Sequence, residues 1–397
     1  MSHPANTSLS KVASLRSLEA LANTRSADDL RDTLTMLHPS FELKNLHELA
    51  IVGASGEGER LVRQCTDAGI AVRGIYDQNP NKLGEPFLNH VVEPLEALAS
   101  KDRALPVIVA SHRGMDAVRI CRRMGFASTV QLALLQVLYP DTFTPHMFYD
   151  GWLEDLVHNT DEYSWLATTL GDAPSHMTLD AILQYRMTLD IMTLETVLDE
   201  DVWHSADMVR YPHNGVYIDG GAYDGDTVRK YISKSHGQFA RIIAFEPDPD
   251  TYGRLTRNFA DEPRVEPVRM GLYREKSVLR FSSAASRASL LHEEGDIEVP
   301  VTSIDEHLNG DPVTFIKMNI EGAELAALQG AANSIRAYRP TMAISAYHAP
   351  SHLWQVAKVI LEIYPGYQLY LRQQDGGSVE TVLYALPSPN ENVRDDQ

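Results

Sequence analysis

The sequence predicts an α/β protein with two open, mostly parallel sheets, a smaller one in the amino-terminal half and a larger one in the carboxy-terminal half. Two glycine-rich turns support this prediction, because each follows a short apolar strand and opens a helix. The first turn spans Gly53 to Gly58 and the second spans Gly220 to Gly225. With 397 residues the chain exceeds one ordinary core, so two or three domains are expected.

Residues 1–40 are expected to form a polar helical arm, since Leu recurs there at helical spacing. The arm either packs on the following domain, which is the favoured interpretation, or joins two copies of the chain in a homodimer.

Residues 41–138 are expected to form a Rossmann-like domain of nucleotide-binding type. An apolar strand leads into the turn Gly53-Ala-Ser-Gly56-Glu-Gly58, and the second strand ends in Asp77, where a ribose hydroxyl would be bound. The glycines are spaced GxxGxG rather than GxGxxG, and no catalytic residue set accompanies them. A ligand-free structural domain is therefore favoured over one that binds a nucleotide, a nucleotide sugar or NAD.

Residues 139–210 change in composition to helix-forming stretches with aromatic residues, divided by the break Gly171-Asp172-Ala173-Pro174. This segment is expected to be a helical connector packed across both domains. Its aromatic residues either fill the core, which is favoured for most of them, or line a pocket.

Residues 211–390 contain the candidate ligand-binding and catalytic residues. The strand VYID ends in Asp219, and a tight turn follows with Gly220, Gly221, Ala222, Tyr223 and Asp224. Two carboxylates at this turn would repel a pyrophosphate but suit a ligand with a cationic sulfonium and an ammonium group. They favour S-adenosyl-L-methionine (SAM) over a dinucleotide.

The next strand ends in Glu246, followed by Pro247 and Asp248. A carboxylate at this strand end can accept hydrogen bonds from two adjacent ribose hydroxyls. The two segments IDGGAYDGDT and IIAFEPDPD together predict a SAM site.

Further strands complete an expected sheet of seven. They are the third strand RVEPVRMGLY, the fourth main strand VTFIKM, and the last three, TMAISAYH, YQLYLRQQ and ETVLYALP. SVLRFSS is expected as an edge strand, residues 282–289 as a mobile loop beside the site, and residues 391–397 as a flexible tail. Lys317, Asn319 and Glu321 end the fourth main strand, and His348 is expected at the same rim.

The carboxy-terminal segments together resemble the FkbM family of SAM-dependent methyltransferases. They are IDGGAYDGDT, IIAFEPDPD, TFIKMNIEGAELAALQGA, AYHAPSHLW and YQLYLRQQDGGSVETVLYA. The resemblance implies a seven-stranded sheet with one reversed strand and O-methylation of a hydroxyl on a sugar or a natural product. An amino-terminal Rossmann-like unit with a helical connector resembles some bacterial members.

Two departures from the family pattern concern the part of the predicted site that would bind the methyl acceptor. The family commonly has Asp where this chain has Asn319, and paired histidines where it has Gln373 and Gln374. Asn is neither a base nor as good a metal ligand as a carboxylate. His348 is therefore the first candidate for the base and Glu321 the second, with Lys317 pairing with a carboxylate.

The bulk composition excludes other classes. A formal net charge of −19 argues against nucleic acid as the main partner, and a small-molecule acceptor is expected instead. No signal peptide or membrane span is expected, which suits a cytoplasmic protein. Cys65 and Cys121 are too few for a disulfide framework, and no metal site is predicted.

Three functions stay open at this point. A SAM-dependent O-methyltransferase is favoured. The alternatives are a non-catalytic SAM-binding module and a nucleotide-sugar or NAD-linked activity of the amino-terminal domain.

Overall fold

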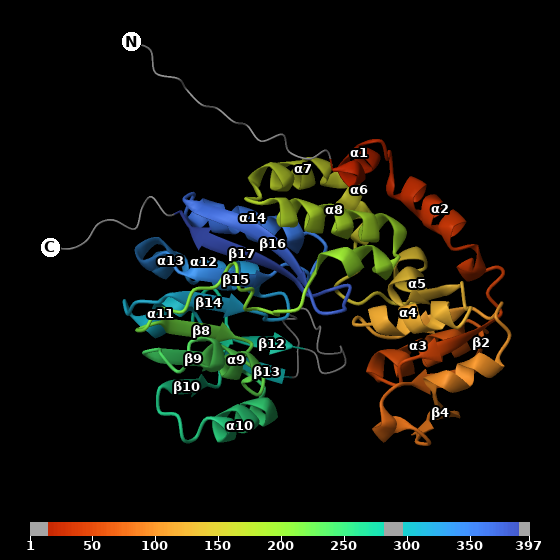
Figure 1. The fold of residues 1–397 in the computed structure, drawn as a ribbon, viewed down its shortest axis with the longest axis horizontal. Helices are drawn as coiled ribbons and strands as arrows, with labels where there is room; N and C mark the ends of the chain where they lie inside the picture. The colour runs from red at the N-terminus through yellow and green to blue at the C-terminus, as the bar shows by residue number, and fades with distance from the viewer. Residues whose placement is uncertain (1–14, 282–296, 389–397) are drawn as a thin grey trace, which may run out of the picture.

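The computed structural model describes residues 15–281 and 297–388. Two α/β parts lie side by side, and a layer of helices spans both of them (Figure 1). Across this described part of the chain, no helix combines the length and the apolar character that crossing a membrane needs. The expected loop at 282–289 and the tail at 391–397 lie outside the described residues.

The predicted amino-terminal arm contains α1 (Arg16–Ala22), α2 (Ala27–Leu37) and a 3₁₀ turn at Pro39–Phe41. Leu21 and Leu34 are buried. The hydroxyl of Ser17 donates to the carbonyl of Asp180, in a connector helix, at 3.0 Å. The arm therefore packs on the connector. It also contacts the first α/β part, as favoured from the sequence, because the hydroxyls of Ser40 and Ser128 lie 2.8 Å apart and α2 packs against α5.

The first α/β part is a six-stranded sheet in the order β3-β4-β2-β1-β5-β6. Its strands are β1 (Glu48–Val52), β2 (Ala71–Asp77), β3 (Pro86–Phe87), β4 (His90–Pro94), β5 (Val107–Val109) and β6 (Thr129–Gln131). Its helices are α3 (Gly56–Asp67), α4 (Met115–Arg123) and α5 (Ala133–Leu138), with 3₁₀ turns at Pro80–Lys82 and Leu95–Ser100. The predicted alternation of strands and helices is present.

The connector contains α6 (Trp152–His158), α7 (Thr160–Thr169), α8 (Ala173–Thr188) and a 3₁₀ stretch at Ile191–Val197. Asp172 caps α8 by accepting from the N–H of Ser175, and Pro174 occupies the first turn, where a missing N–H is harmless. The predicted break between two helical stretches is therefore a helix start.

The second α/β part contains an eight-stranded sheet in the order β10-β9-β8-β14-β15-β17-β16-β7. Its strands are β7 (Leu198–Asp199), β8 (Val216–Gly220), β9 (Arg241–Phe245), β10 (Val265–Val268), β14 (Phe315–Met318), β15 (Thr341–Ser345), β16 (Tyr367–Gln374) and β17 (Thr381–Pro387). Only β17 runs antiparallel to its neighbours. The seven expected strands are present, and one of them, β17, is reversed as expected. The sheet has one strand more than the seven predicted. The extra strand, β7, is a two-residue piece of the connector that pairs with the edge of β16.

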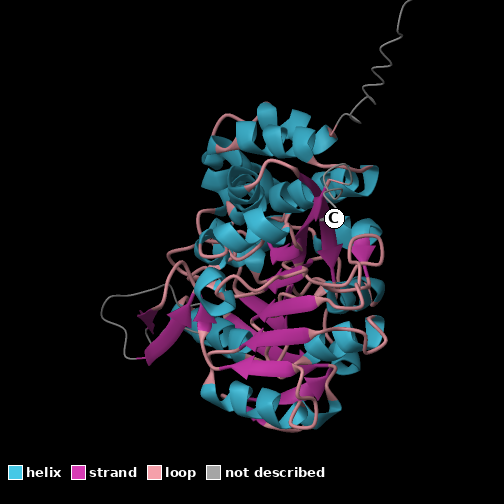
Figure 2. Cartoon of the chain, turned by 90° about the vertical axis from the view of Figure 1, so that its left-hand side faces the viewer, coloured by secondary structure: helices cyan, strands magenta, loops and turns pink. Residues whose placement is uncertain are grey.

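Helices lie on both sides of this sheet (Figure 2). They are α9 (Asp226–Lys234), α10 (Pro249–Asn258), α11 (Ile304–Leu308), α12 (Glu324–Gln329), α13 (Ala332–Tyr338) and α14 (His352–Ile363). Because both faces are covered, the central strands read as continuous apolar runs.

A separate small sheet has the order β11-β13-β12, formed by β11 (Gly271–Leu272), β12 (Ser277–Phe281) and β13 (Ile297–Thr302). The segment SVLRFSS was expected as an edge strand, and its residues 277–281 form β12 at the edge of this small sheet. They pair antiparallel with β13, a strand that the sequence did not suggest.

Candidate active site

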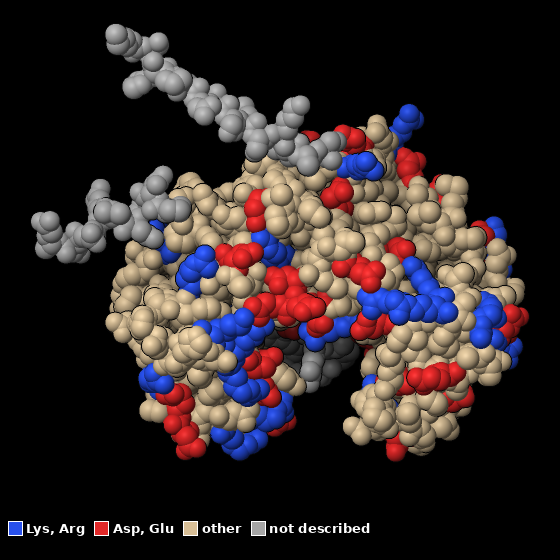
Figure 3. All heavy atoms as spheres, in the orientation of Figure 1, with Lys and Arg blue, Asp and Glu red and all other residues tan. Residues whose placement is uncertain are grey.

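A cavity of about 1730 Å³ opens at the carboxyl ends of β8, β9 and β14. This is the edge where ligands bind in open α/β sheets. The molecule is hollowed between its two α/β parts, and side chains of both charges gather around that opening (Figure 3). The connector contributes Trp203 to the lining, and the amino-terminal part contributes Arg113.

The end of β9 places Glu246 at this cavity, together with Pro247 and Asp248. The backbone N–H groups of Tyr223 and Asp248 each donate to the Glu246 carboxylate at 3.0 Å. Burial raises the pKa of Glu246, whose side chain is almost enclosed. Each carboxylate oxygen has a second lone pair, so Glu246 can accept from two hydroxyl groups as well.

The glycine turn after β8 packs closely against the end of β14. Gly221 has a φ of +72°, and a Cβ there would lie 2.1 Å from the carbonyl oxygen of Asn319. A side chain is excluded by both conditions. Gly221 and Tyr223 line the cavity, whereas Gly220 and Ala222 do not.

Asp219 is fully buried behind the turn and forms an ion pair with Lys317. The Lys317 Nζ lies 2.8 Å from an Asp219 carboxylate oxygen and donates to the Gly221 carbonyl at 2.8 Å. The two residues face each other in the pairing of β8 with β14. This pair fixes the turn and leaves Asp219 outside the cavity lining.

Asp224 also has a cationic partner, Arg229, at 2.9 Å, and does not line the cavity. The sequence suggested two carboxylates available to a cationic ligand, but both are paired with basic side chains. The spacing within one turn could not reveal a lysine supplied by another strand. Cofactor binding by Asp219 and Asp224 stays a prediction.

His348 and Glu321 lie together at the other end of the cavity, as expected from the sequence. The Nε2 of His348 lies 3.9 Å from a carboxylate oxygen of Glu321 and makes no hydrogen bond within the described residues. Glu321 has a φ of +54°, a strained conformation for a residue with a side chain, and such strain clusters at functional sites.

Glu324 controls the charge of this histidine. Its Oε1 lies 2.9 Å from the Nδ1 of His348, and it also accepts from the N–H of Ile320 at 2.8 Å. Burial lowers the pKa of His348, but the charge and hydrogen bond of Glu324 and the charges of Glu321 and Glu380 together outweigh burial, so the pKa is raised overall. The sequence placed Glu324 at the start of a helix without assigning it to the site.

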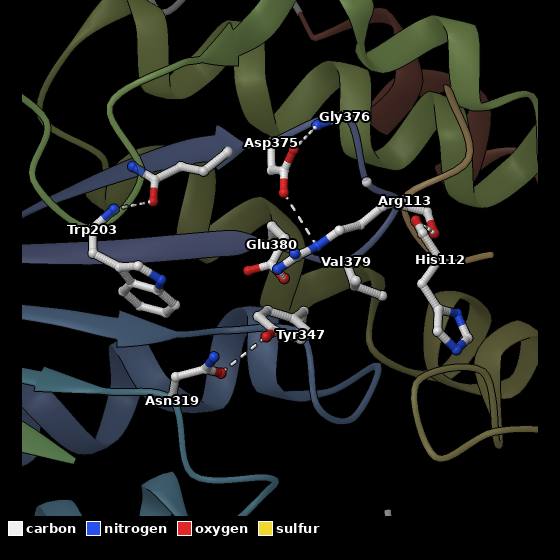
Figure 4. A network of polar contacts seen from close by, with 12 residues as sticks. His112, Arg113, Trp203, Asn319, Tyr347, Asp375, Gly376, Val379 and Glu380 are labelled. Carbon is white, nitrogen blue, oxygen red and sulfur yellow. Dashed lines mark hydrogen bonds and ion pairs between the residues drawn. The ribbon is translucent and has the colours of Figure 1, made fainter. Parts of the chain in front are cut away.

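Asn319 accepts a hydrogen bond from the hydroxyl of Tyr347 at 2.9 Å, drawn in Figure 4. Burial first, and then the nearby carboxylates, raise the pKa of Tyr347 well above its usual value, so it stays a neutral donor. Asn319 lines the cavity. The Tyr347 hydroxyl therefore fixes the Asn319 side chain in the cavity lining.

Gln373 and Gln374 are fully buried and do not line the cavity. Gln373 accepts from the hydroxyl of Thr381 at 2.6 Å, which ties β16 to β17. Gln374 accepts from the backbone N–H of Trp203 at 2.6 Å and donates to Tyr384 at 2.8 Å. These two departures from the family pattern therefore organise the connector and the hairpin, and neither removes a base from the cavity.

Arg113 reaches the cavity from the loop after β5, and Figure 4 shows its guanidinium between two acidic residues. It lies 2.6 Å from Glu380 and 3.2 Å from Asp375. No sequence motif indicated Arg113, because it is far from the other cavity residues in the sequence and reaches them only through the packing of the two α/β parts.

The Asp77 carboxylate that follows the first glycine turn already has three hydrogen-bond donors within its own domain. Asp77 accepts from the N–H groups of Ala54 and Asn79, each at 2.8 Å, and from Lys82 at 3.1 Å. Burial raises the pKa of Asp77, but these donors hold it below its usual value. A Cβ on Gly58 would lie 2.1 Å from the carbonyl oxygen of Gly53. These contacts favour the structural interpretation of this turn.

Comparison with known proteins agrees with the carboxy-terminal geometry. The model of the "Methyltransferase FkbM domain" matches residues 219–374. The matched segment contains the second glycine turn, Glu246 and the end of β14. The resemblance expected from the sequence is thereby confirmed.

The crystal structure of methyltransferase FkbM from Methylobacillus flagellatus KT extends the similarity beyond the FkbM domain. It is 25% identical, has a TM-score of 0.68, and the match covers 94% of this chain and 97% of that one. The hexuronic acid methyltransferase AglP of Haloferax volcanii is 34% identical over 104 residues. That match covers 24% of this chain and 44% of the relative, so this chain matches less than half of AglP.

Proposed function

We propose that this protein is a SAM-dependent methyltransferase that transfers a methyl group to a hydroxyl of a sugar or natural product. The observation that carries the proposal is the placement of Glu246, almost buried but lining the cavity, next to the glycine turn of an FkbM domain. The similarity to a hexuronic acid methyltransferase supports a sugar as the acceptor.

The residues at the cofactor end fit SAM. Glu246 has acceptor capacity left for two ribose hydroxyls, and Gly221 lets the turn pack against the end of β14 at the edge of the cavity. The ion pair of Lys317 with Asp219 holds the turn in place. When bound, SAM supplies an electrophilic methyl group on a sulfonium.

The residues at the acceptor end can position a hydroxyl and remove its proton. His348 accepts the proton on Nε2, because Nδ1 faces the Glu324 carboxylate, which stabilises the resulting imidazolium. Glu321 lies 3.9 Å from that Nε2 and is the second candidate for this role. Asn319, held by the Tyr347 hydroxyl, adds a polar side chain to the same cavity lining.

Calorimetry with S-adenosylhomocysteine tests the cofactor assignment. Glu246→Gln should weaken binding by about ten-fold or more, because hydrogen bonds to a charged group contribute about 1.5–3 kcal/mol. Glu96→Gln, at an exposed position of the amino-terminal part, is the matched control. Undetectable binding, or equal binding by Glu246→Gln and the control, would contradict the proposal.

Transfer of a radioactive methyl group from SAM to a panel of neutral sugars and hexuronic acids tests the reaction. Retained cofactor binding without transfer to any hydroxyl would instead favour a non-catalytic SAM-binding module.

A further inference from the structure

Three side chains with metal-ligand chemistry meet where the amino-terminal part faces the FkbM domain. Glu57 lies in the first turn of α3, His112 in the loop after β5, and His146 in the segment between α5 and α6. One ligand atom from each lies within 4.8 Å of the others. The three residues are far apart in the sequence, so no spacing motif indicated a metal site there.

Two imidazole nitrogens and one carboxylate oxygen form a donor set suited to Zn²⁺ and related transition-metal ions, whereas Ca²⁺ and Mg²⁺ prefer oxygen ligands alone. Such a set leaves a coordination position open.

Neighbouring contacts hold the histidines in place. The Nδ1 of His112 lies 3.0 Å from the hydroxyl of Tyr149, which in turn lies 3.1 Å from the hydroxyl of Ser378, in the loop between β16 and β17. A hydrogen bond at one ring nitrogen leaves the other for a metal, as is usual for histidine ligands. The ring of His146 packs on Phe148, with centroids 4.0 Å apart.

The cluster lies next to the wall of the active-site cavity. Arg113 and Met147, the sequence neighbours of His112 and His146, line that cavity. Phe148 also packs on Tyr347 and His348, with centroid distances of 5.6 and 5.9 Å. A metal held here would fix the cavity wall that the amino-terminal part supplies.

Arg60 is the competing cation at this place. Its Nη2 lies 2.6 Å from a carboxylate oxygen of Glu57, and its positive charge also acts on both histidines. A divalent ion would compete with this guanidinium for Glu57. Removal of the Arg60 charge should therefore strengthen metal binding, whereas removal of a ligand should weaken it.

We propose that Glu57, His112 and His146 bind one Zn²⁺ ion at the junction of the two α/β parts. This site does not depend on the proposed methyl transfer, because it lies outside the set of residues that would hold SAM or the acceptor.

Titration of the chelator-treated 397-residue chain with Zn²⁺ in a calorimeter tests the site. One ion should bind per chain. His112→Gln and His146→Gln should each weaken binding by at least about ten-fold, the loss that even an outer-shell change produces. Arg60→Gln should bind more tightly, and His47→Gln, at an exposed histidine, should match the wild type.

Substitution with Co²⁺ gives an independent readout, because its visible absorption reports the ligand geometry. The absorption bands should appear at one equivalent and disappear in the histidine variants, whose folding is checked by circular dichroism. Less than one bound Zn²⁺ per wild-type chain would overturn the proposal. So would equal affinity in the wild type, the folded histidine variants and Arg60→Gln.

Discussion

The Nδ1 of His348 lies 2.9 Å from the Oε1 of Glu324, and both side chains are buried beside the cavity. The pair affects whether the His348 ring that faces the cavity is protonated or neutral. Glu324 stabilises the imidazolium and thereby raises the pKa of His348 above its usual 6.5, against the lowering effect of burial.

The first prediction concerns the pH dependence of methyl transfer. Only neutral His348 can accept a proton, so kcat/KM should rise with pH through an acid limb above 6.5. Glu324→Gln removes the charge that raises the pKa and should move this limb to lower pH. A pH profile of kcat/KM for the wild type, Glu324→Gln and the Glu96→Gln control measures the shift; an unmoved limb would assign the base elsewhere.

The second prediction concerns stability and the same pair. The pKa of Glu324 is lowered to about 2 from 4.5, mainly by His348 against the effect of burial, so its contribution is present above pH 4.5 and lost as pH falls towards 2. The pKa of His348 is raised, so its contribution is present below pH 6.5 and lost as pH rises through the folded-state value. The stabilisation should therefore be largest between these limits.

Urea unfolding of the wild type and His348→Gln from pH 3 to pH 9 checks this window. The difference in unfolding free energy should peak near pH 5 to 6 (between the two unshifted values) and shrink on both sides. A difference that is constant with pH would show that the pair contributes through packing alone.

The third prediction concerns the buried ion pair of Asp219 with Lys317. Lys317→Met leaves the Asp219 carboxylate buried without its partner, which should lower the unfolding free energy by about 3–5 kcal/mol. Asp219→Asn combined with Lys317→Met should recover part of this loss. The control Arg63→Met breaks an exposed ion pair with Glu59 and should change stability by about 1 kcal/mol or less.

Much of the fold could be predicted because the local signals agree. Apolar strands, glycine turns and an acidic residue at each second strand placed both sheets, and Gly221 and Glu246 line the cavity at the expected edge. The break before α8 was also readable, since Asp172 and Pro174 are typical of a helix start.

What could not be predicted depends on contacts between distant segments. β7 is too short to have a periodicity, and it is a strand only because β16 offers a free edge. Gln374 was interpreted as a change at the acceptor end, whereas its amide holds Trp203. Arg113 reaches the cavity only because the two α/β parts meet there.

The fourth prediction compares two glycines with the same backbone conformation. Gly221 and Gly237 both have a φ of +72°, but a Cβ on Gly221 would lie 2.1 Å from a backbone oxygen and one on Gly237 meets nothing within 4 Å. Gly237→Ala should lose about 1–2 kcal/mol from its left-handed conformation alone. Gly221→Ala should lose clearly more and should also weaken S-adenosylhomocysteine binding, as thermal melts and calorimetry can measure. Equal losses would contradict the close packing of this turn.

The last prediction concerns Asn319, where the family commonly has Asp. The Asn319 side-chain oxygen already accepts from Tyr347 at 2.9 Å, and Asp would keep this bond. If His348 is the base, Asn319→Asp should preserve the fold and change kcat by less than about ten-fold. If instead the chain lacks a base because position 319 is Asn, then Asn319→Asp should raise kcat by about 10²–10⁴-fold, the usual contribution of a general base. Asn319→Leu is the matched control: it removes the acceptor for the buried Tyr347 hydroxyl and should lower stability by about 1–3 kcal/mol. A large rise in kcat for Asn319→Asp would transfer the role of base from His348 to position 319.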